Sequence, residues 1–578
     1  ISGNSSRVEA AGDVDVKALD RSTLVSVALG IAGASTNAGG VAISHNYIGG
    51  NNFDLSPYLT STFLSSGLLG LDALVPDRGY LRAYIDGATV DAGGDVSVLA
   101  HGASILTNVS IGGAGAGANA VGGSIAVNFI RNDITADIRN GADVDADGKL
   151  DLVALSTETM IVVAGGGAGS GGNAAGITVA VNESFITAEA SIKGALTEVD
   201  VANNIQVNAA DSTTMFVLAV GGAGASTNAA GAAIATTNVG NTVSATIDAA
   251  AVNSSAGSVD VTAGVLPTGT DLNLSILGLN LDGLPPELDL DLGSQIITLA
   301  VGGAGSGVNA AGGAVSLNWL KNNVSASITN GAVVVAANAI NVKAKDEATI
   351  VSVAVGVAFS GANAGGVAIA FNYIGGDPLD LTPFLESEFV RPDNSTSTDS
   401  ASVLAYIDNA NVQSSTGSVN VEAEGLATLT NVSVGGAGSG ANAIGGSIAF
   451  NFIRNSIKAD IKNGSTVNAN GTVDVLASSS EQLIVAAGAA SGAGAAAASI
   501  VTAVNETAAT VRASIDGAAT DVNASGNLRV LATDQTHLVL IAIGGSGAAN
   551  VAGGAVIATT QVMNDIKAFI DAADVTSQ

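Results

Sequence analysis

The stretch Asn431–Gly464 reads NVSVGGAGSGANAIGGSIAFNFIRNSIKADIKNG, and the earlier stretch Asn108–Gly141 reads NVSIGGAGAGANAVGGSIAVNFIRNDITADIRNG. The two differ at seven positions, with changes as mild as Val434 for Ile111, and they lie about 323 residues apart. An enzyme needs its active site only once. A chain that repeats a whole surface is therefore typical of a repeat architecture, in which similar units stack on one another.

The same glycine-rich phrase recurs along the chain and carries two asparagines nine residues apart. The first falls at Asn37, Asn119, Asn173, Asn228, Asn309, Asn363 and Asn442, with Ala496 in the eighth unit and a displaced Asn550 in the ninth. The second falls at Asn46, Asn128, Asn182, Asn318, Asn372, Asn451 and Asn505, with Thr237 and Thr560 in the fourth and ninth units. The spacing is about 54 residues, stretched to about 80 in three places, and units one to four match units six to nine. We interpret these columns as stacked amide ladders or turn residues.

Within a unit the hydrophobic period is two, which predicts β-strands. Ile448, Phe450 and Phe452 alternate with smaller residues, so we expect this apolar set to face the core. The alternation slips at residues 453–455, which predicts a corner there. Asn-Gly pairs and a further strand near Val473 follow.

These patterns predict an all-β, elongated, right-handed parallel β-solenoid in which each 54-residue unit supplies about two coils. A meander of long β-hairpins turning at Gly440–Gly446 is the alternative. We divide the chain into residues 1–24, the end of a preceding unit; 25–323, a first five-unit block; and 324–578, a second, incomplete block. Because it starts and stops within a unit, we expect a piece of a longer chain.

The stretched spacings indicate inserts at about residues 48–83, 265–296 and 374–402, and these contain all eight prolines. Proline removes a ladder hydrogen bond, so we interpret the inserts as loops, with one extra coil per insert as the alternative. Inserts one and three are related and place aromatic residues at Tyr58, Phe63, Phe384 and Phe389. These are candidate partner contacts; the alternative is a small knob folded back on its own sheet.

The composition limits the classes of function. Hydrophobic residues make up 47% of the chain but aromatic residues only 3%, and there are 75 glycines. This favours thin, closely stacked sheets. Fifty acidic residues against 19 basic ones give a net charge of −31, which argues against nucleic acid as a partner. With no cysteine, no disulfide framework is possible.

Several motifs resemble functional sites, but the sequence around each of them argues against that function. DVDADGKLD has the spacing of a calcium loop, with Asp143, Asp145, Asp147 and Asp151 as candidate ligands, although the expected twelfth-position acid is Ala154. The GxGxxG at Gly167 is followed by strand-like sequence rather than the helix that a dinucleotide site requires. The uncharged run Leu483–Val504 could span a bilayer, but its register with the third unit predicts strand–turn–strand. His45, His101 and His537 share no repeat column, so they predict neither a catalytic set nor a zinc site.

The stretch Ser327–Ile350, SITNGAVVVAANAINVKAKDEATI, has a GA-x-V-x-A…I-x-V-x-A cadence. It resembles the repeats of giant bacterial surface proteins of the filamentous-haemagglutinin and large-adhesin kind. The resemblance implies a secreted, extracellular or cell-surface β-solenoid. We therefore expect a structural or adhesive, non-enzymatic filament component that associates with copies of itself, laterally or end to end, and with surface glycans, without a membrane span and without a cofactor other than calcium. The alternatives are a β-helical polysaccharide lyase or epimerase and a calcium- or glycan-binding module.

Overall fold

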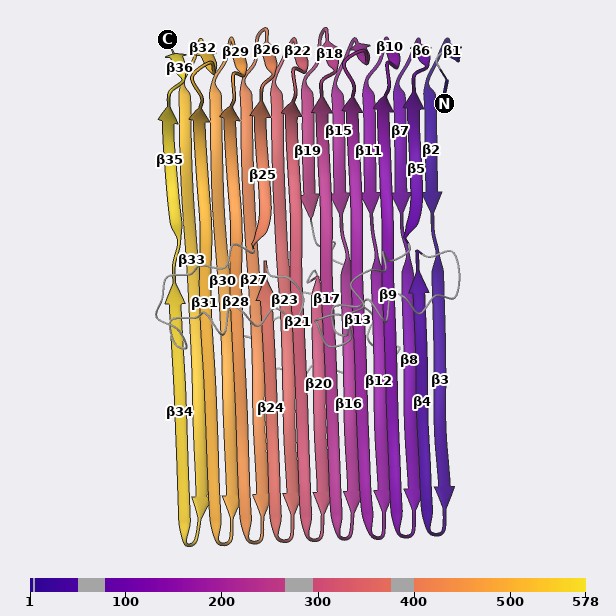
Figure 1. Cartoon of the computed structure of the whole chain (residues 1–578), viewed down its shortest axis with the longest axis vertical. Helices are drawn as coiled ribbons and strands as arrows, with labels where there is room; N and C mark the ends of the chain where they lie inside the picture. The colour runs from indigo at the N-terminus through magenta and orange to yellow at the C-terminus, as the bar shows by residue number, and fades with distance from the viewer. Residues whose placement is uncertain (4–5, 50–77, 266–294, 376–399, 578) are drawn as a thin grey trace.

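The computed structural model describes residues 1–3, 6–49, 78–265, 295–375 and 400–577. Every element in these residues is a β-strand, and the strands pair in parallel in three sheets (Figure 1). The prediction of an all-β parallel β-solenoid is thus confirmed. The alternative of a hairpin meander is wrong, because consecutive strands of a meander would pair in an antiparallel way.

The three sheets differ in strand length. The top sheet holds ten four-residue strands: β1 (Arg7–Ala10), β6 (Thr89–Ala92), β10 (Asp143–Ala146), β14 (Glu198–Val201), β18 (Ala251–Ser254), β22 (Val333–Ala336), β26 (Asn411–Ser414), β29 (Thr466–Ala469), β32 (Asp521–Ala524) and β36 (Asp574–Ser577). The descending sheet holds β2 (Val14–Asp20), β3 (Thr23–Ala34), β7 (Val96–Gly102), β8 (Ile105–Ala116), β11 (Leu150–Ser156), β12 (Thr159–Ser170), β15 (Ile205–Asp211), β16 (Thr214–Ala225), β19 (Val259–Val265), β20 (Ile296–Ser306), β23 (Ile340–Ser360), β27 (Val419–Ser439), β30 (Val473–Ala493) and β33 (Leu528–Ala548). The ascending sheet holds β4 (Asn37–Ile48), β5 (Gly79–Asp86), β9 (Asn119–Arg139), β13 (Asn173–Lys193), β17 (Asn228–Asp248), β21 (Asn309–Thr329), β24 (Asn363–Ile374), β25 (Ala401–Asp408), β28 (Asn442–Lys462), β31 (Ala496–Asp516), β34 (Val551–Val562) and β35 (Asp565–Asp571).

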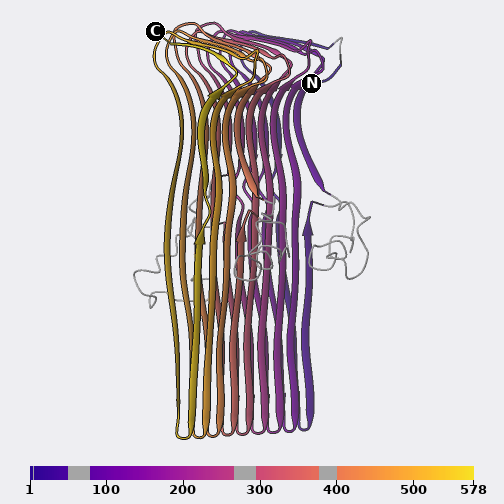
Figure 2. The same ribbon diagram turned by 60° about the vertical axis from the view of Figure 1, so that its left-hand side comes forward.

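One coil of the solenoid uses one whole repeat unit. The chain passes from a top strand down the descending sheet, reverses in a tight turn, and climbs the ascending sheet to the next top strand (Figure 2). Asn173 pairs with Asn228, one unit further along, and with Asn119, one unit back. The prediction of two coils per unit is therefore wrong, because β13 alone runs for 21 residues. Since neighbouring strands lie about 4.8 Å apart, each unit lengthens the stack by only that distance. The longest axis of the molecule accordingly runs along the strands (Figure 1).

The expected corner at residues 453–455 is also absent, because β28 continues straight through them. Its inward positions keep one parity from Ala443 to Ile461. Ile448 and Phe450 therefore lie on the outward side, opposite to the prediction, and small residues face inward. Phe452, also at an outward position, is fully buried and packs against Phe371 at 5.7 Å between ring centroids.

Glycine explains why small residues face inward near the turns. A Cβ atom added to Gly302 would lie 1.6 Å from the carbonyl oxygen of Gly313 in the facing sheet, and one added to Gly112 would lie 1.6 Å from that of Gly123. The two long sheets therefore approach backbone to backbone, more closely than the roughly 10 Å of an ordinary sandwich. We call this region, between mid-coil and the tight turns, the tip half; the third coil contributes residues 159–182.

The rest of each coil, the top half, holds larger aliphatic side chains. Ile138, Val144 and Leu152 are fully buried in one continuous core that runs through all the coils. Three of the ascending strands, β9, β21 and β28, end there in turns at Asn-Gly pairs, as predicted. Asn140 and Gly141 have φ angles of 59° and 75°, a left-handed conformation that glycine and asparagine tolerate best.

The strands on either side of each insert align with one and the same neighbour. Ile48 of β4 pairs with Ile130 of β9, and Gly79 of β5 pairs with Asn132, only two residues further along β9. The same arrangement holds for β24 and β25 against β28. The flanking strands thus complete one coil between them, which favours the loop interpretation over an extra coil. Tyr58, Phe63, Phe384 and Phe389 lie outside the described residues, so their role as partner contacts stays a prediction.

Candidate functional site

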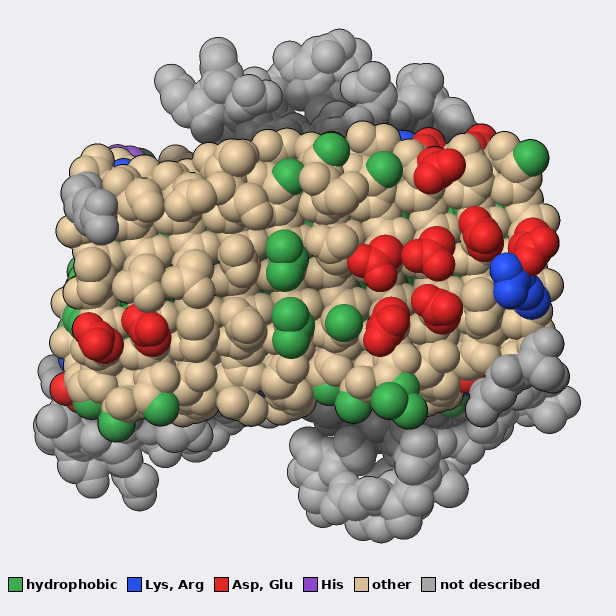
Figure 3. Space-filling model, turned by 90° about the horizontal axis from the view of Figure 1, so that it is seen from above, with side chains coloured by type: hydrophobic (Ala, Val, Ile, Leu, Met, Phe, Trp, Pro, Cys, Tyr) green, Lys and Arg blue, Asp and Glu red, His purple; other side chains and the backbone are tan. Residues whose placement is uncertain are grey.

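The most prominent charged feature is an acidic stripe on the top sheet. Asp91, Asp145 and Asp200 occupy the same position in three consecutive strands, and Asp143 pairs with Glu198 beside them. Figure 3 shows these acidic side chains gathered over one part of the top face. Burial and then the neighbouring carboxylates, Asp143 first, raise the pKa of Asp145. The stripe ends where Asn253 takes the same position in the next strand.

The candidate calcium ligands lie at this stripe but do not form a loop around one point. Asp143 and Asp145 belong to the extended strand β10, Asp147 follows in a turn, and Asp151 lies on β11. Asp151 forms an ion pair with Lys149, with 2.7 Å between Oδ2 and Nζ. Within the part of the chain that the structure describes, no three acidic or histidine side chains form a group able to hold a metal ion. The calcium site stays a prediction.

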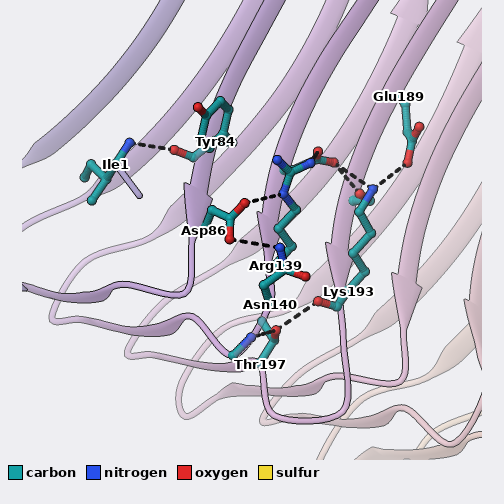
Figure 4. Close-up of polar contacts among 11 residues, drawn as sticks. Ile1, Tyr84, Asp86, Arg139, Asn140, Glu189, Lys193 and Thr197 are labelled. Carbon is teal, nitrogen blue, oxygen red and sulfur yellow. Dashed lines mark hydrogen bonds and ion pairs between the residues drawn. The ribbon is translucent and has the colours of Figure 1, made fainter. Parts of the chain in front are cut away.

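A second charged cluster joins three coils near the top of the ascending sheet (Figure 4). Arg139 forms ion pairs with Asp86 and Asp137, both at 2.9 Å, and Lys193 forms ion pairs with Asp137 at 3.2 Å and Glu189 at 3.1 Å. Hydrogen bonds from Asn140 and Arg139 lower the pKa of Asp86. Each charge has a partner of opposite sign, so the cluster connects neighbouring coils.

A layer of inward-facing carboxylates, which was not predicted from the sequence, crosses the interior between the top half and the tip half; all are buried except Asp534 in the last coil, which is half-buried. Carboxylates of the descending sheet accept hydrogen bonds from asparagines of the ascending sheet. The pairs are Asn132 to Glu158 at 3.0 Å, Asn241 to Asp211 at 2.7 Å, Asn322 to Asp346 at 2.8 Å and Asn564 to Asp534 at 2.6 Å. Burial raises the pKa of Glu158 to about 7, of Asp211 to about 6, of Asp346 to about 7 and of Glu481 to about 8.

A signal for this layer was present in the sequence. Glu158 and Glu481 lie one five-unit block apart, as do Asp211 and Asp534, in segments that are otherwise apolar or uncharged. A carboxylate repeated in strand sequence at the block period indicates an inward position with a fixed partner. At the same level, Arg131 and Glu183 form a nearly buried ion pair at 3.0 Å, and Arg454 and Glu506 form its equivalent at 2.7 Å. Because the carboxylate–asparagine pairs and the arginine–glutamate pairs have their partners within the protein, we interpret them as structural.

The two asparagine columns are amide ladders, as predicted. In the exposed column beside the tight turns, each side-chain amide donates to the preceding one, as in Asn363 to Asn309 at 2.8 Å. In the buried column the direction reverses, as in Asn318 to Asn372 at 2.7 Å and Asn372 to Asn451 at 2.9 Å. Each ladder stabilises the register of successive coils.

Replacing Asn372 with alanine should lower the free energy of unfolding by about 2–4 kcal/mol, because it removes two interior hydrogen bonds, one from Asn318 and one to Asn451, that water cannot replace. Asn363→Ala removes two similar hydrogen bonds in the exposed ladder, where water replaces them, and should cost less than about 1 kcal/mol. Urea denaturation of both variants measures the difference. Equal losses would contradict a special role for the buried ladder.

The remaining residues and motifs singled out in the sequence do not form a site. His45 lies on β4 and stacks near Phe129, with ring centroids 5.8 Å apart, whereas His101 contacts Thr157 at 3.2 Å and His537 lies on β33. The glycines around Gly167 belong to β12, and the run Leu483–Val504 forms parts of β30 and β31 joined by a tight turn, as predicted. The described residues contain no helix long and apolar enough to cross a membrane.

Comparison with known proteins adds no relative: no protein-family model, curated protein or solved structure matches this chain.

Proposed function

We propose that this chain is a structural and adhesive segment of an extracellular repeat protein that forms a rod or filament at the cell surface. The observation that carries the proposal is the in-register stacking of equivalent coils. All 21 positions of β13 pair with the corresponding positions of β9 and β17, and the same pairing continues from β27 to β33. A stack of this kind can be extended by adding units without altering the earlier ones.

The surface chemistry supports the same function. A net charge of −31 favours solubility through self-repulsion, which suits a large exposed assembly. Many of the interior polar groups are paired within and between coils, as in the carboxylate–asparagine layer. The repeat cadence resembles that of large bacterial adhesins and filamentous haemagglutinins, which is the basis for proposing the cell surface.

The test has two parts. Antibodies raised against the purified chain should bind intact, unpermeabilised producing cells, and protease added outside the cells should remove the signal. Electron microscopy of the native protein should show particles that lengthen by about 4.8 Å for each additional unit. Detection only after cell lysis would overturn the surface location. Reproducible turnover of a polysaccharide, abolished by one Asp or Arg substitution, would instead favour a β-helical lyase or epimerase.

A further inference from the structure

The outward side of the ascending sheet in the tip half is an apolar face with no charged side chain. The described segments that form the tip half, such as residues 159–182, 296–320 and 348–374, contain no Asp, Glu, Lys or Arg. We name this outward side the ascending tip face. We define it by three rows of outward residues, and each row contains one residue from every coil. The row nearest mid-coil is wholly β-branched: Ile43, Ile125, Val179, Ile234, Val315, Ile369, Ile448, Thr502 and Ile557.

The other two rows mix large and small side chains, and in the middle row the two sizes largely alternate. The middle row reads Val41, Gly123, Ile177, Ala232, Gly313, Val367, Gly446, Ile500 and Ala555. The row nearest the turns reads Gly39, Val121, Ala175, Ala230, Ala311, Gly365, Ile444, Ala498 and Gly553. Val121 and Ile444 stand in the two coils where the middle row has Gly123 and Gly446.

The small residues are true hollows and the large ones project. A Cβ atom added to Gly39, Gly313 or Gly365 would meet nothing within 4 Å. In contrast, Val41, Ile177, Ile444 and Ile500 expose 53%, 46%, 57% and 51% of their surface. A face with knobs and hollows of this kind can interdigitate with another such face, as facing sheets do in a sandwich.

We propose that the ascending tip face is the lateral interface with a second copy of this chain, an inference that rests on the proposed function as a surface rod or filament. With strands about 4.8 Å apart and about 3.3 Å per residue, three rows over nine coils cover on the order of 900 Å² per partner. A stable protein interface needs about 800 Å² per partner, so the face is large enough for a dimer.

The pattern favours an identical partner over other occupants. Coils one to three carry nearly the same large and small residues as coils six to eight: Val41 is equivalent to Val367, and Ile177 to Ile500. A second copy presents the same row spacing and the same alternation, so that knobs can meet hollows over the whole face. A lipid surface would gain nothing from this alternation, and the exposed amide ladder at its edge would lose water.

The test compares matched double variants of the described face and of the opposite sheet. Val367→Lys with Ile444→Lys places two charges on the ascending tip face. Val434→Lys with Ile541→Lys places two charges on the outward side of the descending sheet, where Val434 is 39% exposed, against 38% for Val367. Sedimentation velocity of the purified chain at micromolar concentrations measures the monomer–dimer equilibrium of each.

We expect the wild type and the descending-sheet variant to dimerise and the ascending-face variant to dimerise at least about 100-fold more weakly, since two charges would be buried without partners. A monomeric wild type, or equal weakening by both pairs, would overturn the interface. Flotation of the monomeric wild type with phosphatidylcholine vesicles, lost only in the ascending-face variant, would also overturn it and indicate a lipid surface. Circular dichroism of each variant confirms that the β-structure is retained. An absence of dimers would not contradict cell-surface display, because antibody binding to intact cells tests that proposal separately.

Discussion

Replacing Gly302 with alanine should destabilise the solenoid by at least about 3 kcal/mol, whereas Gly305→Ala in the same strand should have almost no effect. The added methyl group at Gly302 would lie 1.6 Å from the carbonyl oxygen of Gly313, so the two sheets must move apart. Overpacking of a close backbone contact is among the few changes that cost this much. Separation would also weaken the contacts of neighbouring coils, since strands share one sheet.

Gly305 is the matched control. It lies three residues further along β20 on the outward side, where an added Cβ atom meets nothing within 4 Å. Both variants make the same chemical change in the same strand, so β-propensity is nearly the same for both. Thermal or urea unfolding followed by circular dichroism measures the loss. Equal stability of the two variants would show that the sheets are not held as close as the structure indicates.

The destabilisation caused by a Gly→Ala change at this inward position should be smaller in the eighth and ninth coils. Ala489 already occupies the position equivalent to Gly302, and Val501 faces the interior nearby. A Cβ atom added to Gly544 in the ninth coil would first meet a methyl group of Val556 at 2.9 Å rather than backbone. Because a side-chain methyl can rotate away, Gly544→Ala should cost less than Gly302→Ala.

The second large effect is on pH dependence: the free energy of unfolding should fall as the pH rises from about 4 to about 8.5. Burial raises the pKa values of Glu158, Asp211, Asp346 and Glu481 to between about 6 and about 8. In the unfolded chain such groups titrate near 4. A folded pKa above the unfolded one means that the folded state binds more protons. The stabilisation is therefore fully present below about pH 4 and is lost as the pH rises through the folded pKa values.

Asp346→Asn isolates one contributor. The amide cannot ionise, and its oxygen can still accept the hydrogen bond from Asn322. Below about pH 4, where Asp346 is protonated in both the folded and the unfolded state, the variant and the wild type should unfold at similar urea concentrations. At pH 8 the variant should be more stable, by up to about 3–4 kcal/mol, because the wild type must hold a buried charge or take up a proton. An exposed carboxylate, Asp15, supplies the control substitution Asp15→Asn. A pH profile that Asp346→Asn leaves unchanged would contradict this account.

The sequence alone predicted the class of fold and several of its details. The parallel ladder follows from unit-to-unit identity, because equivalent side chains that stack in register need equivalent neighbours. The amide ladders at Asn363 and Asn372, the turn at Asn463 and the strand–turn–strand form of Leu483–Val504 were predicted from columns and turn residues, and the structure confirms them. The acidic stripe was also visible, since Asp145 belongs to the predicted calcium motif.

The tertiary structure decided which side of each strand faces inward. Alternation in Ile448–Phe452 defines two faces but not their direction, and the usual preference for burying large apolar residues pointed the wrong way here. Two sheets whose backbones touch at Gly302 and Gly313 leave no room for an isoleucine between them, so the larger side chains face outward. The pairing of Glu158 with Asn132 likewise joins the two sheets across the interior, which the strand pattern alone does not predict.

The two copies of the repeated stretch also differ in this way between inward and outward positions. Six of the seven differences between Asn108–Gly141 and Asn431–Gly464 lie at outward positions, and the seventh, Ser439 for Ala116, lies beside the tight turn. The inward residues are otherwise identical in the two copies. Local alternation and repetition were therefore enough to predict β-strands that stack in parallel from unit to unit, but not the length of the coil. Only the contact between the two sheets, which joins residues of different strands across the interior, selected the small residues for the inside and left an apolar face outside.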